Sequence, residues 1–398
     1  MSVYLRRRDP DRFALAEVLR PDGRPLAQDR WPGATLHSAF HPHYLGEGTV
    51  WQREVRGPAM PLARNSKRMA RWMWENSPTP WNPDAFGVRT SLNRSVYGTH
   101  PIPLYIVDSS DARCPRAVMR TAVAWGASDQ EKAAFLDGEI PWPEHVEPAR
   151  NQDRGLAIAD TYTGIIREWF YVTPDGPGRW RARNGGFSVT SPGLRELART
   201  NWATQLVRGS NAVCGMHNAL GFIGIAEVLR GGIEHALAFT TANFARGLSP
   251  SWPAKMSDGK APADQAPHSP THGQWARVSA GVDPQRDPRT GRPYNPLTRM
   301  LIRAGQRYGL VGTDTNAWAH AFNAESGYEL AALTGEDPWE DGGLIARTIS
   351  PEDPERAFDV SDFPWDRTEW APVDWGRPAV DFSPRPGAYW PHVRKDGS

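Results

Sequence analysis

Between residues 80 and 295, apolar and polar positions alternate with the two-residue period of β-strands. The pattern is clearest in LAIAD, IIREWFYVT and RWRARNGG, and the turn-forming sequences TYTG and PDGPG separate these segments. Shorter segments of the same kind are SVYGTHPIPLYIVDSS, ARVSAG and LVGTDT. Because closely spaced turns join strands that fold back on their neighbours, the sequence predicts a mainly β chain, an antiparallel β-sandwich of jelly-roll type.

Helical periodicity is restricted to a few short segments. The clearest begins at Asn295, whose side chain can cap a helix, and has Pro296 in its first position. A second has apolar side chains around residues 69–73 and stops before Pro78, and a third, IAEVLRGG, ends in a Gly-Gly pair. The first of these helices is predicted to have one apolar face, formed by Leu297, Leu301, Ala304 and Tyr308.

Neither end of the chain has this periodicity. Residues 1–60 are rich in Pro, Arg and His, and residues after about 340 combine tryptophans with prolines and acidic side chains. We therefore expect an N-terminal arm over 1–60, a β-sandwich domain over 61–340 and a C-terminal arm over 341–398, both arms being extended.

The C-terminal arm cannot form a core of its own, yet large aromatic rings are rarely left in water. The simplest solution is an arm that lies over another surface and places each ring in a pocket. That surface belongs either to the same domain or, as we favour, to a neighbouring subunit. The docking side chains are predicted to be Trp365, Trp370, Trp375 and Trp390.

Charge and composition exclude several classes of protein. The 398 residues hold 46 Lys+Arg against 45 Asp+Glu, a formal net charge of +1 that creates no field for nucleic acid. No apolar run approaches the length of a membrane span, and the N-terminus has no apolar segment typical of a secretory signal. No cofactor motif occurs, so we expect no cofactor. Cys114 and Cys214 are interpreted as buried thiols, with a disulfide as the alternative.

The segment HSAFHPHYLGEG concentrates side chains that can bind metals. Their spacing matches no zinc pattern, and ligands in such a segment would need a fixed scaffold. We therefore interpret the segment as a surface loop and predict no metal site there. The residues concerned are His37, His41, His43 and Glu47.

The sequence GGIEHALAFTTANF, residues 231–244, places a histidine near the start of a predicted strand. In one interpretation, His235 lines a cleft and performs acid–base chemistry on a glycan. In the other, which we favour, it is buried and bonded to a carboxylate or a carbonyl. We interpret Asp258 as a turn former. The candidate partners of His235 in the catalytic interpretation are Asp153, Asp160, Glu168, His217 and Glu227.

Several segments together resemble a known domain family. They are NQDRGLAIADTYTGIIREWFYV, GGFSV, GFIGIAEVLRGGIEHALAF, WPAKMSDG, HGQWARVSAGVDP and LTRMLIRAGQRYGLVGTDT. This series is similar to a jelly-roll domain of secreted actinobacterial proteins and of minor tail proteins of actinobacteriophages. One departure is that the family places a histidine shortly after the leading aspartate, whereas Arg154 and Gly155 follow Asp153 here. The matching residues are Gly224, Glu227, Gly231, Ile233, His235, Ala236, Leu237, Pro253, Ala254, Asp258, Gly259, Val282, Asp283, Pro284, Tyr308, Gly309 and Asp314.

The resemblance implies a structural protein of a bacteriophage virion, a minor tail or tail-tip protein that is assembled in the host cytoplasm. Such a protein is expected to contact other virion proteins and copies of itself, and to bind cell-envelope glycans. The alternative is a polysaccharide-active enzyme, a glycoside hydrolase or lyase, of the same fold. We favour the structural role, and two acidic side chains facing each other across an open cleft would favour the enzyme.

Overall fold

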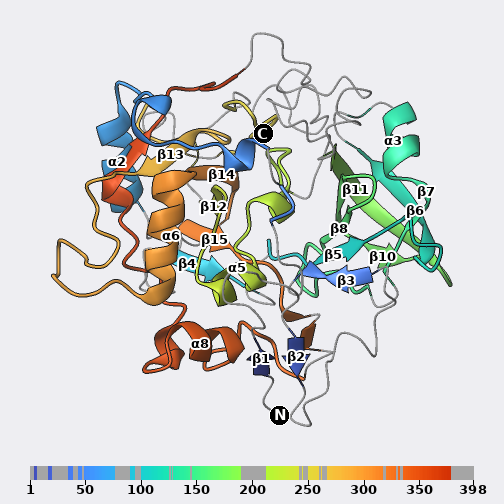
Figure 1. The fold of residues 1–398 in the computed structure, drawn as a ribbon. Helices are drawn as coiled ribbons and strands as arrows, with labels where there is room; N and C mark the ends of the chain where they lie inside the picture. The colour runs from blue at the N-terminus through green and yellow to red at the C-terminus, as the bar shows by residue number, and fades with distance from the viewer. Residues whose placement is uncertain are drawn as a thin grey trace.

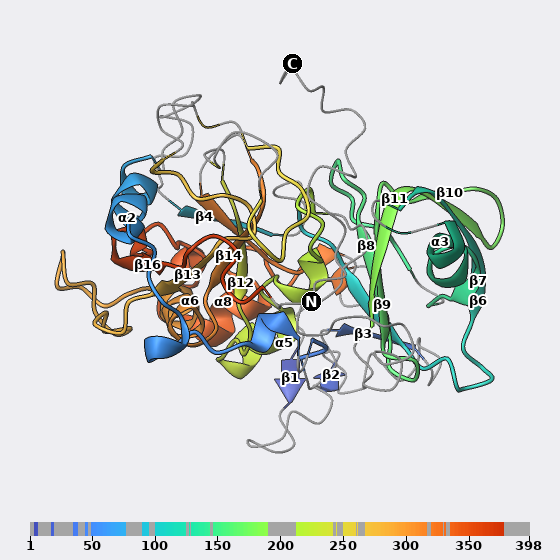
Figure 2. The same cartoon turned by 90° about the horizontal axis from the view of Figure 1, so that it is seen from above.

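The computed structural model folds the described chain around two β-sheets, which lie on opposite halves of the molecule (Figure 1, Figure 2). A separate pair of short strands, β1 (Tyr4–Arg6) and β2 (Glu17–Leu19), is antiparallel. The structure describes residues 4–6, 17–19, 35–38, 44–46, 49–76, 90–94, 100–124, 127, 129–143, 146–189, 212–241, 244, 250–259, 261, 267–316, 320–328, 330–331 and 335–377.

The first sheet has eight strands in the order β3-β5-β8-β9-β11-β6-β7, with β10 paired to β11. The predicted turn TYTG joins β8 to β9 as an antiparallel hairpin and ends at Gly164, whose φ of 67° lies in the left-handed region. The strands are β3 (Thr35–His37), β5 (Leu104–Val107), β6 (Arg116–Val123), β7 (Gly138–Pro141), β8 (Leu156–Asp160), β9 (Ile165–Phe170), β10 (Thr173–Pro174) and β11 (Arg179–Val189).

The second sheet has six strands in the order β16-β13-β14-β12-β15-β4. Its two central strands, β12 and β14, run parallel, with Leu237 opposite Leu310 and Thr240 opposite Asp314. Their carboxyl ends therefore meet at one edge of the sheet. The strands are β4 (Thr90–Asn93), β12 (Leu237–Thr240), β13 (Trp275–Val278), β14 (Leu310–Asp314), β15 (His320–Asn323) and β16 (Thr368–Trp370).

The mainly β class with few helices is confirmed, but a purely antiparallel arrangement is wrong. Both sheets are mixed, because β5 pairs with β8, β6 with β11, β12 with β14 and β4 with β15 in parallel. Parallel neighbours need a long crossover connection. Between β12 and β14 the chain forms β13 and a helix before it returns, so the local turn signals did not reveal which strands would pair.

The three predicted helices are present. In α6 (Pro296–Arg307) the Asn295 side chain accepts a hydrogen bond from the Leu297 N–H, as the sequence predicts. The helix α2 (Ser66–Glu75) buries Met69, Trp72 and Met73. The helix α5 (Ile225–Arg230) ends at Gly231, whose φ is 88°. Further helices and 3-10 turns are α3 (Asp129–Phe135), α8 (Leu344–Ile349), η2 (Val50–Gln52), η3 (Gly57–Ala59), η5 (Asn218–Leu220), η6 (Pro354–Arg356) and η7 (Trp365–Arg367).

Apolar side chains form a central core between the two sheets and an outer core on the far side of each. Successive residues of a strand point to opposite faces. In β8, Ala157 and Ala159 therefore reach the central core, whereas Leu156 and Ile158 reach the outer core of the first sheet. In the second sheet, Ala238, Trp275 and Val311 join the central core, and Leu237, Phe239, Ala276 and Leu310 join the outer core that α2, α6 and α8 cover.

The described segments 49–60 and 344–370 pack into the fold instead of forming extended arms. Trp51, Val55 and Met60 are buried in the central core. Residues 344–370 form α8, η6, η7 and β16, and β16 adds a strand to the edge of the second sheet. The tryptophans of this segment dock, but on their own domain instead of a neighbouring subunit. Trp365 and Trp370 are fully buried, Trp375 is partly buried against the central core, and Trp390 lies outside the described residues.

Candidate active site

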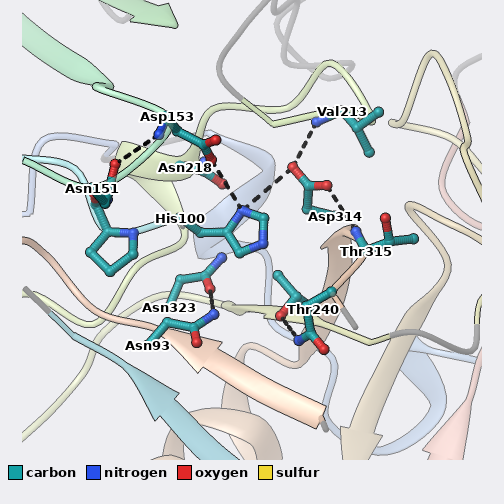
Figure 3. Close-up of polar contacts among 12 residues, drawn as sticks. Asn93, His100, Asn151, Asp153, Val213, Asn218, Thr240, Asp314, Thr315 and Asn323 are labelled. Atoms are coloured by element: carbon teal, nitrogen blue, oxygen red, sulfur yellow. Dashed lines mark hydrogen bonds and ion pairs between the residues drawn. The ribbon is translucent and has the colours of Figure 1, made fainter. Parts of the chain in front are cut away.

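A cluster of polar side chains gathers where loops of the first sheet meet the carboxyl end of β14 (Figure 3). His100 lies in the extended segment before β5, and Asp153 lies in the turn before β8. Asp314 is the last residue of β14. The carboxyl ends of parallel strands are a common place for ligand sites in sheets with parallel strands. The fold therefore brings together three side chains from separate parts of the chain.

The imidazole of His100 lies between two carboxyl groups. Its Nδ1 is 3.7 Å from Oδ2 of Asp314 and 4.0 Å from Oδ2 of Asp153. These distances are too long for hydrogen bonds, and an electrostatic interaction links His100 to Asp153. They also place the two carboxyl oxygens at most roughly 8 Å apart, an upper bound that is compatible with the separations of carboxyl pairs that cleave glycosidic bonds.

Backbone groups hold both carboxyl-bearing residues in place. Oδ2 of Asp314 accepts a 2.9 Å hydrogen bond from the Val213 N–H, and its Oδ1 accepts one of 2.8 Å from the Thr315 N–H. The Asn151 side chain accepts a 3.1 Å bond from the Asp153 N–H and donates a 2.7 Å bond to the Pro101 carbonyl. Asn151 thus ties the turn that carries Asp153 to the segment that carries His100.

Burial and neighbouring charges set the proton affinities of the cluster. Burial raises the pKa of Asp153 to about 6, and the nearby His100 opposes that rise. Burial and the charge of Asp258 raise the pKa of Asp314 well above its usual range, although the two backbone donors oppose them. Burial lowers the pKa of His100. At neutral pH Asp153 is therefore mostly ionised and the imidazole of His100 is neutral, whereas the pKa of Asp314 lies well above its usual range.

Solvent reaches the side chain of Asp153, whereas Asp314 and His100 are buried. The exposed fraction of the side chain is 24% for Asp153 and 11% for Asp314, against 7% for His100. An acid and a base with pKa values raised by their surroundings are what general acid–base catalysis requires. The feature expected to favour an enzyme over a structural protein was two acids facing each other across an open cleft, and the His100 cluster brings two acids to one imidazole.

Asp258 contributes a third carboxyl group, although its sequence context predicted a turn former. Its Oδ2 accepts a 2.7 Å hydrogen bond from Oγ1 of Thr315, which follows Asp314 directly. The buried His272 lies behind it, with Nε2 3.6 Å from Oδ1 of Asp258 and Nδ1 2.8 Å from Oγ of Ser257. Ser257 is also buried, and the contact between His272 and Asp258 is too long for a hydrogen bond, so this Ser–His–Asp arrangement does not present an activated nucleophile.

The histidine that the sequence singled out has a structural role. His235 is 1% exposed, its Nε2 lies 3.0 Å from Oε2 of Glu227, and its Nδ1 lies 2.8 Å from the Ala236 carbonyl oxygen. The ring stacks on Tyr44 at a centroid distance of 4.5 Å. The favoured interpretation of a buried, bonded histidine is confirmed, although β12 begins only at Leu237.

The other sequence candidates divide between the site and the scaffold. Asp153 alone lies in the cluster. Glu168 is fully buried and accepts backbone hydrogen bonds from Asn218 and Ala219, which fixes the start of η5. Asp160 accepts hydrogen bonds from Ser109, Tyr162 and Thr163 and organises the turn after β8. His217 is fully buried, and burial lowers its pKa to about 3.

His100 was not among the candidates predicted from the sequence, and Asp314 was predicted without a chemical role. His100 stands before a Pro-Ile-Pro segment that enters a strand, and Asp314 ends an apolar strand. Polar residues at strand ends are the signal that could have identified both. The residues that His100 and Asp314 contact, however, lie in distant parts of the sequence, so local sequence patterns do not show that they come together.

Neither cysteine takes part in a disulfide, and both thiols are buried, as predicted. Burial raises the pKa of Cys214 well above its usual value, which leaves the thiol protonated and unreactive. In the described ranges, no group of three or more His, Cys, Asp or Glu side chains could hold a metal ion. His41, His43 and Glu47 lie outside the described residues, and of His37 the structure describes only its backbone pairing with Tyr105.

No protein-family model matches the chain, and neither curated proteins nor solved structures give a significant match. Within the described residues, no helix has both the length and the apolar character needed to cross a membrane. The chemistry of the His100 cluster is therefore interpreted from its own geometry.

Proposed function

We propose that the protein cleaves a cell-envelope polysaccharide by general acid–base catalysis at the His100 cluster. One observation carries the proposal: two carboxyl groups with raised pKa values, of which that of Asp153 is partly exposed, flank a single imidazole at 3.7 and 4.0 Å. When the surroundings give two neighbouring carboxyl groups different pKa values, the group with the higher pKa can act as the acid and the other as the base. Asp314 is the acid and Asp153 is the base.

In the proposed hydrolysis, Asp314 donates its proton to the glycosidic oxygen as the bond from that oxygen to the anomeric carbon breaks. Asp153 removes a proton from a water molecule, whose oxygen forms the new bond to the same carbon. Asp314 loses one proton and Asp153 gains one, so the protein has no net change in protons. The reaction consumes one water molecule and needs no other reactant. When His100 is protonated, its charge lowers the pKa of Asp153 and favours the ionised form of that carboxyl.

The test is turnover of arabinan, galactan and peptidoglycan, followed by the release of reducing ends. Asp153→Asn and Asp314→Asn should each lower the rate about 10²- to 10⁴-fold, the usual contribution of an acid or base. Asp283→Asn, which changes an exposed aspartate outside the cluster, serves as the control and should match the wild type. Equal rates for all four proteins would contradict the proposal.

A second proposal concerns where this activity operates. The motifs shared with the jelly-roll family support a minor tail or tail-tip protein of an actinobacteriophage, assembled with other virion proteins and with copies of itself. Glycan cleavage fits such a position, because a tail must pass the cell envelope. The docked tryptophans no longer support a subunit contact, since Trp365 and Trp370 fill pockets of their own domain. Mass spectrometry of purified particles tests this proposal, and absence of the protein from them would contradict it.

A further inference from the structure

An asparagine amide with no hydrogen-bond partner lies beside the acid–base cluster. Asn218 is 1% exposed, and neither its Oδ1 nor its Nδ2 has a hydrogen-bond partner in the described chain. Figure 3 places this side chain next to Asp153. Its backbone N–H donates a 3.2 Å hydrogen bond to Oε1 of the buried Glu168, so the residue is held firmly while its amide is left unused.

A second amide lies on another side of the imidazole. Asn323, the last residue of β15, is fully buried, and its Oδ1 accepts a 3.0 Å hydrogen bond from Nδ2 of Asn93. Its own Nδ2 has no partner among the described residues. Figure 3 shows Asn323 and Asn93 below His100. Two amides thus flank the cluster with donors and an acceptor that no described group satisfies.

Buried polar groups in folded proteins are nearly always hydrogen-bonded, and an unpaired one costs free energy. Unpaired amides beside a reactive cluster are therefore explained by a partner that arrives from outside. The partner must both donate and accept, because Oδ1 and Nδ2 of Asn218 are both unsatisfied. A hydroxyl group meets that requirement, whereas a carboxylate or phosphate only accepts and would be repelled by Asp153 and Asp258.

We infer that Asn218 and Asn323 bind the hydroxyl groups of a neutral sugar and set the specificity of the site for uncharged polysaccharides. The inference rests on the proposed function, because it places that sugar beside Asp153 and Asp314. A site built to hydrogen-bond a substrate hydroxyl rejects ligands that cannot make the bond. The two amides therefore select the substrate class without taking part in proton transfer.

The experiment measures binding in a protein that does not turn over. In the Asp314→Asn background, calorimetry follows neutral arabino- and galacto-oligosaccharides and, for comparison, acidic oligogalacturonides. Adding Asn218→Leu or Asn323→Leu should weaken binding of the neutral ligand at least tenfold. The Asn218→Leu change should leave the melting temperature unchanged or raise it, because the amide makes no bond within the described fold.

Controls separate this outcome from a structural effect. Asn218→Ala repeats the test without adding side-chain volume. Asn65→Ala removes an amide away from the cluster, one that donates a 2.9 Å bond to the Pro267 carbonyl, and should bind like the parent. Unchanged binding by both leucine variants, no binding of either neutral ligand, or equal binding of the acidic ligand would overturn the inference. A different result would separate the two proposals. If the wild-type protein cleaves no polysaccharide but a neutral oligosaccharide binds and the asparagine variants weaken that binding, the proposed cleavage is refuted and this inference stands.

Discussion

The indole Nε1 of Trp365 donates a 2.8 Å hydrogen bond to Oγ1 of Thr90, in the edge strand β4 of the second sheet. The same indole stacks on Phe322 with a centroid distance of 5.7 Å and an interplanar angle of 10°. Its edge-on neighbour Phe239 lies 5.2 Å away. The segment after residue 340 is therefore part of the outer core of the second sheet, and the fold depends on it.

A chain truncated after residue 359 should fail to fold. It loses β16 and the fully buried Trp365 and Trp370, and loss of one buried tryptophan side chain typically costs about 3–5 kcal/mol. Two such losses equal much of the stability of an ordinary domain, about 5–15 kcal/mol. Circular dichroism and thermal melts provide the measurement. Truncation after residue 377 keeps all these contacts and is the control, and a cooperative melt of the shorter chain would contradict this account.

The buried pair of His235 and Glu227 should make stability depend on pH. Burial alone would lower the pKa of His235, but the charge of Glu227 and the hydrogen bond to it raise it above 6.5. Burial would raise the pKa of Glu227, but His235 outweighs burial and lowers it below 4.5. The histidine contribution is complete below pH 6.5 and is lost as pH rises through the raised pKa. The glutamate contribution is present above pH 4.5 and is lost as pH falls through the lowered pKa.

Replacing His235 by Ala should therefore cost about 1–3 kcal/mol near pH 5.5, because Glu227 is left buried without its partner. The difference from the wild type should shrink as pH rises above 6.5. Urea unfolding at several pH values measures both quantities. Glycan cleavage should persist in the folded variant, since His235 lies outside the cluster. A difference in stability that does not change with pH would contradict the ion-pair interpretation.

Asp258 should control the alkaline side of the pH–activity profile. Its negative charge raises the pKa of Asp314, so Asp258→Asn should lower that pKa. Asp314 would then lose its proton at a lower pH, and the fall of kcat/KM at high pH should begin earlier. The rise of kcat/KM on the acid side should stay near pH 6, where Asp153 becomes ionised. Asp283→Asn is the control, and an alkaline limb that does not move would contradict this role.

Local sequence signals predicted the elements better than their arrangement. The capping side chain of Asn295, the Gly-Gly pair after α5 and the TYTG turn each act on neighbouring residues, so the sequence was enough to predict α6, α5 and the β8–β9 hairpin. Parallel pairing of β12 with β14 depends on a crossover through β13 and α6, which no local pattern encodes. The same reason applies to the C-terminal tryptophans. The sequence predicted that these side chains would be buried, but it did not show which surface would bury them.

The candidate site was predicted only in part for a related reason. Asp153 was named because it precedes a strand in a motif shared with a family. His100 and Asp314 come within 3.7 Å of each other only through the fold, since they lie in segments more than two hundred residues apart. Conversely, the His235 motif drew attention because its residues are close in sequence, and the structure assigns it to the scaffold.

The most direct test of the assigned acid and base uses substrates that differ only in their leaving group. A dinitrophenyl glycoside needs no proton to leave, so Asp314→Asn should cleave it at nearly the wild-type rate while losing about 10²- to 10⁴-fold on the polysaccharide. Asp153→Asn should lose activity on both substrates, because the water still needs a base. If Asp314→Asn is impaired equally on both substrates, or if both variants cleave the polysaccharide like the wild type, Asp314 is not the acid and the account is wrong.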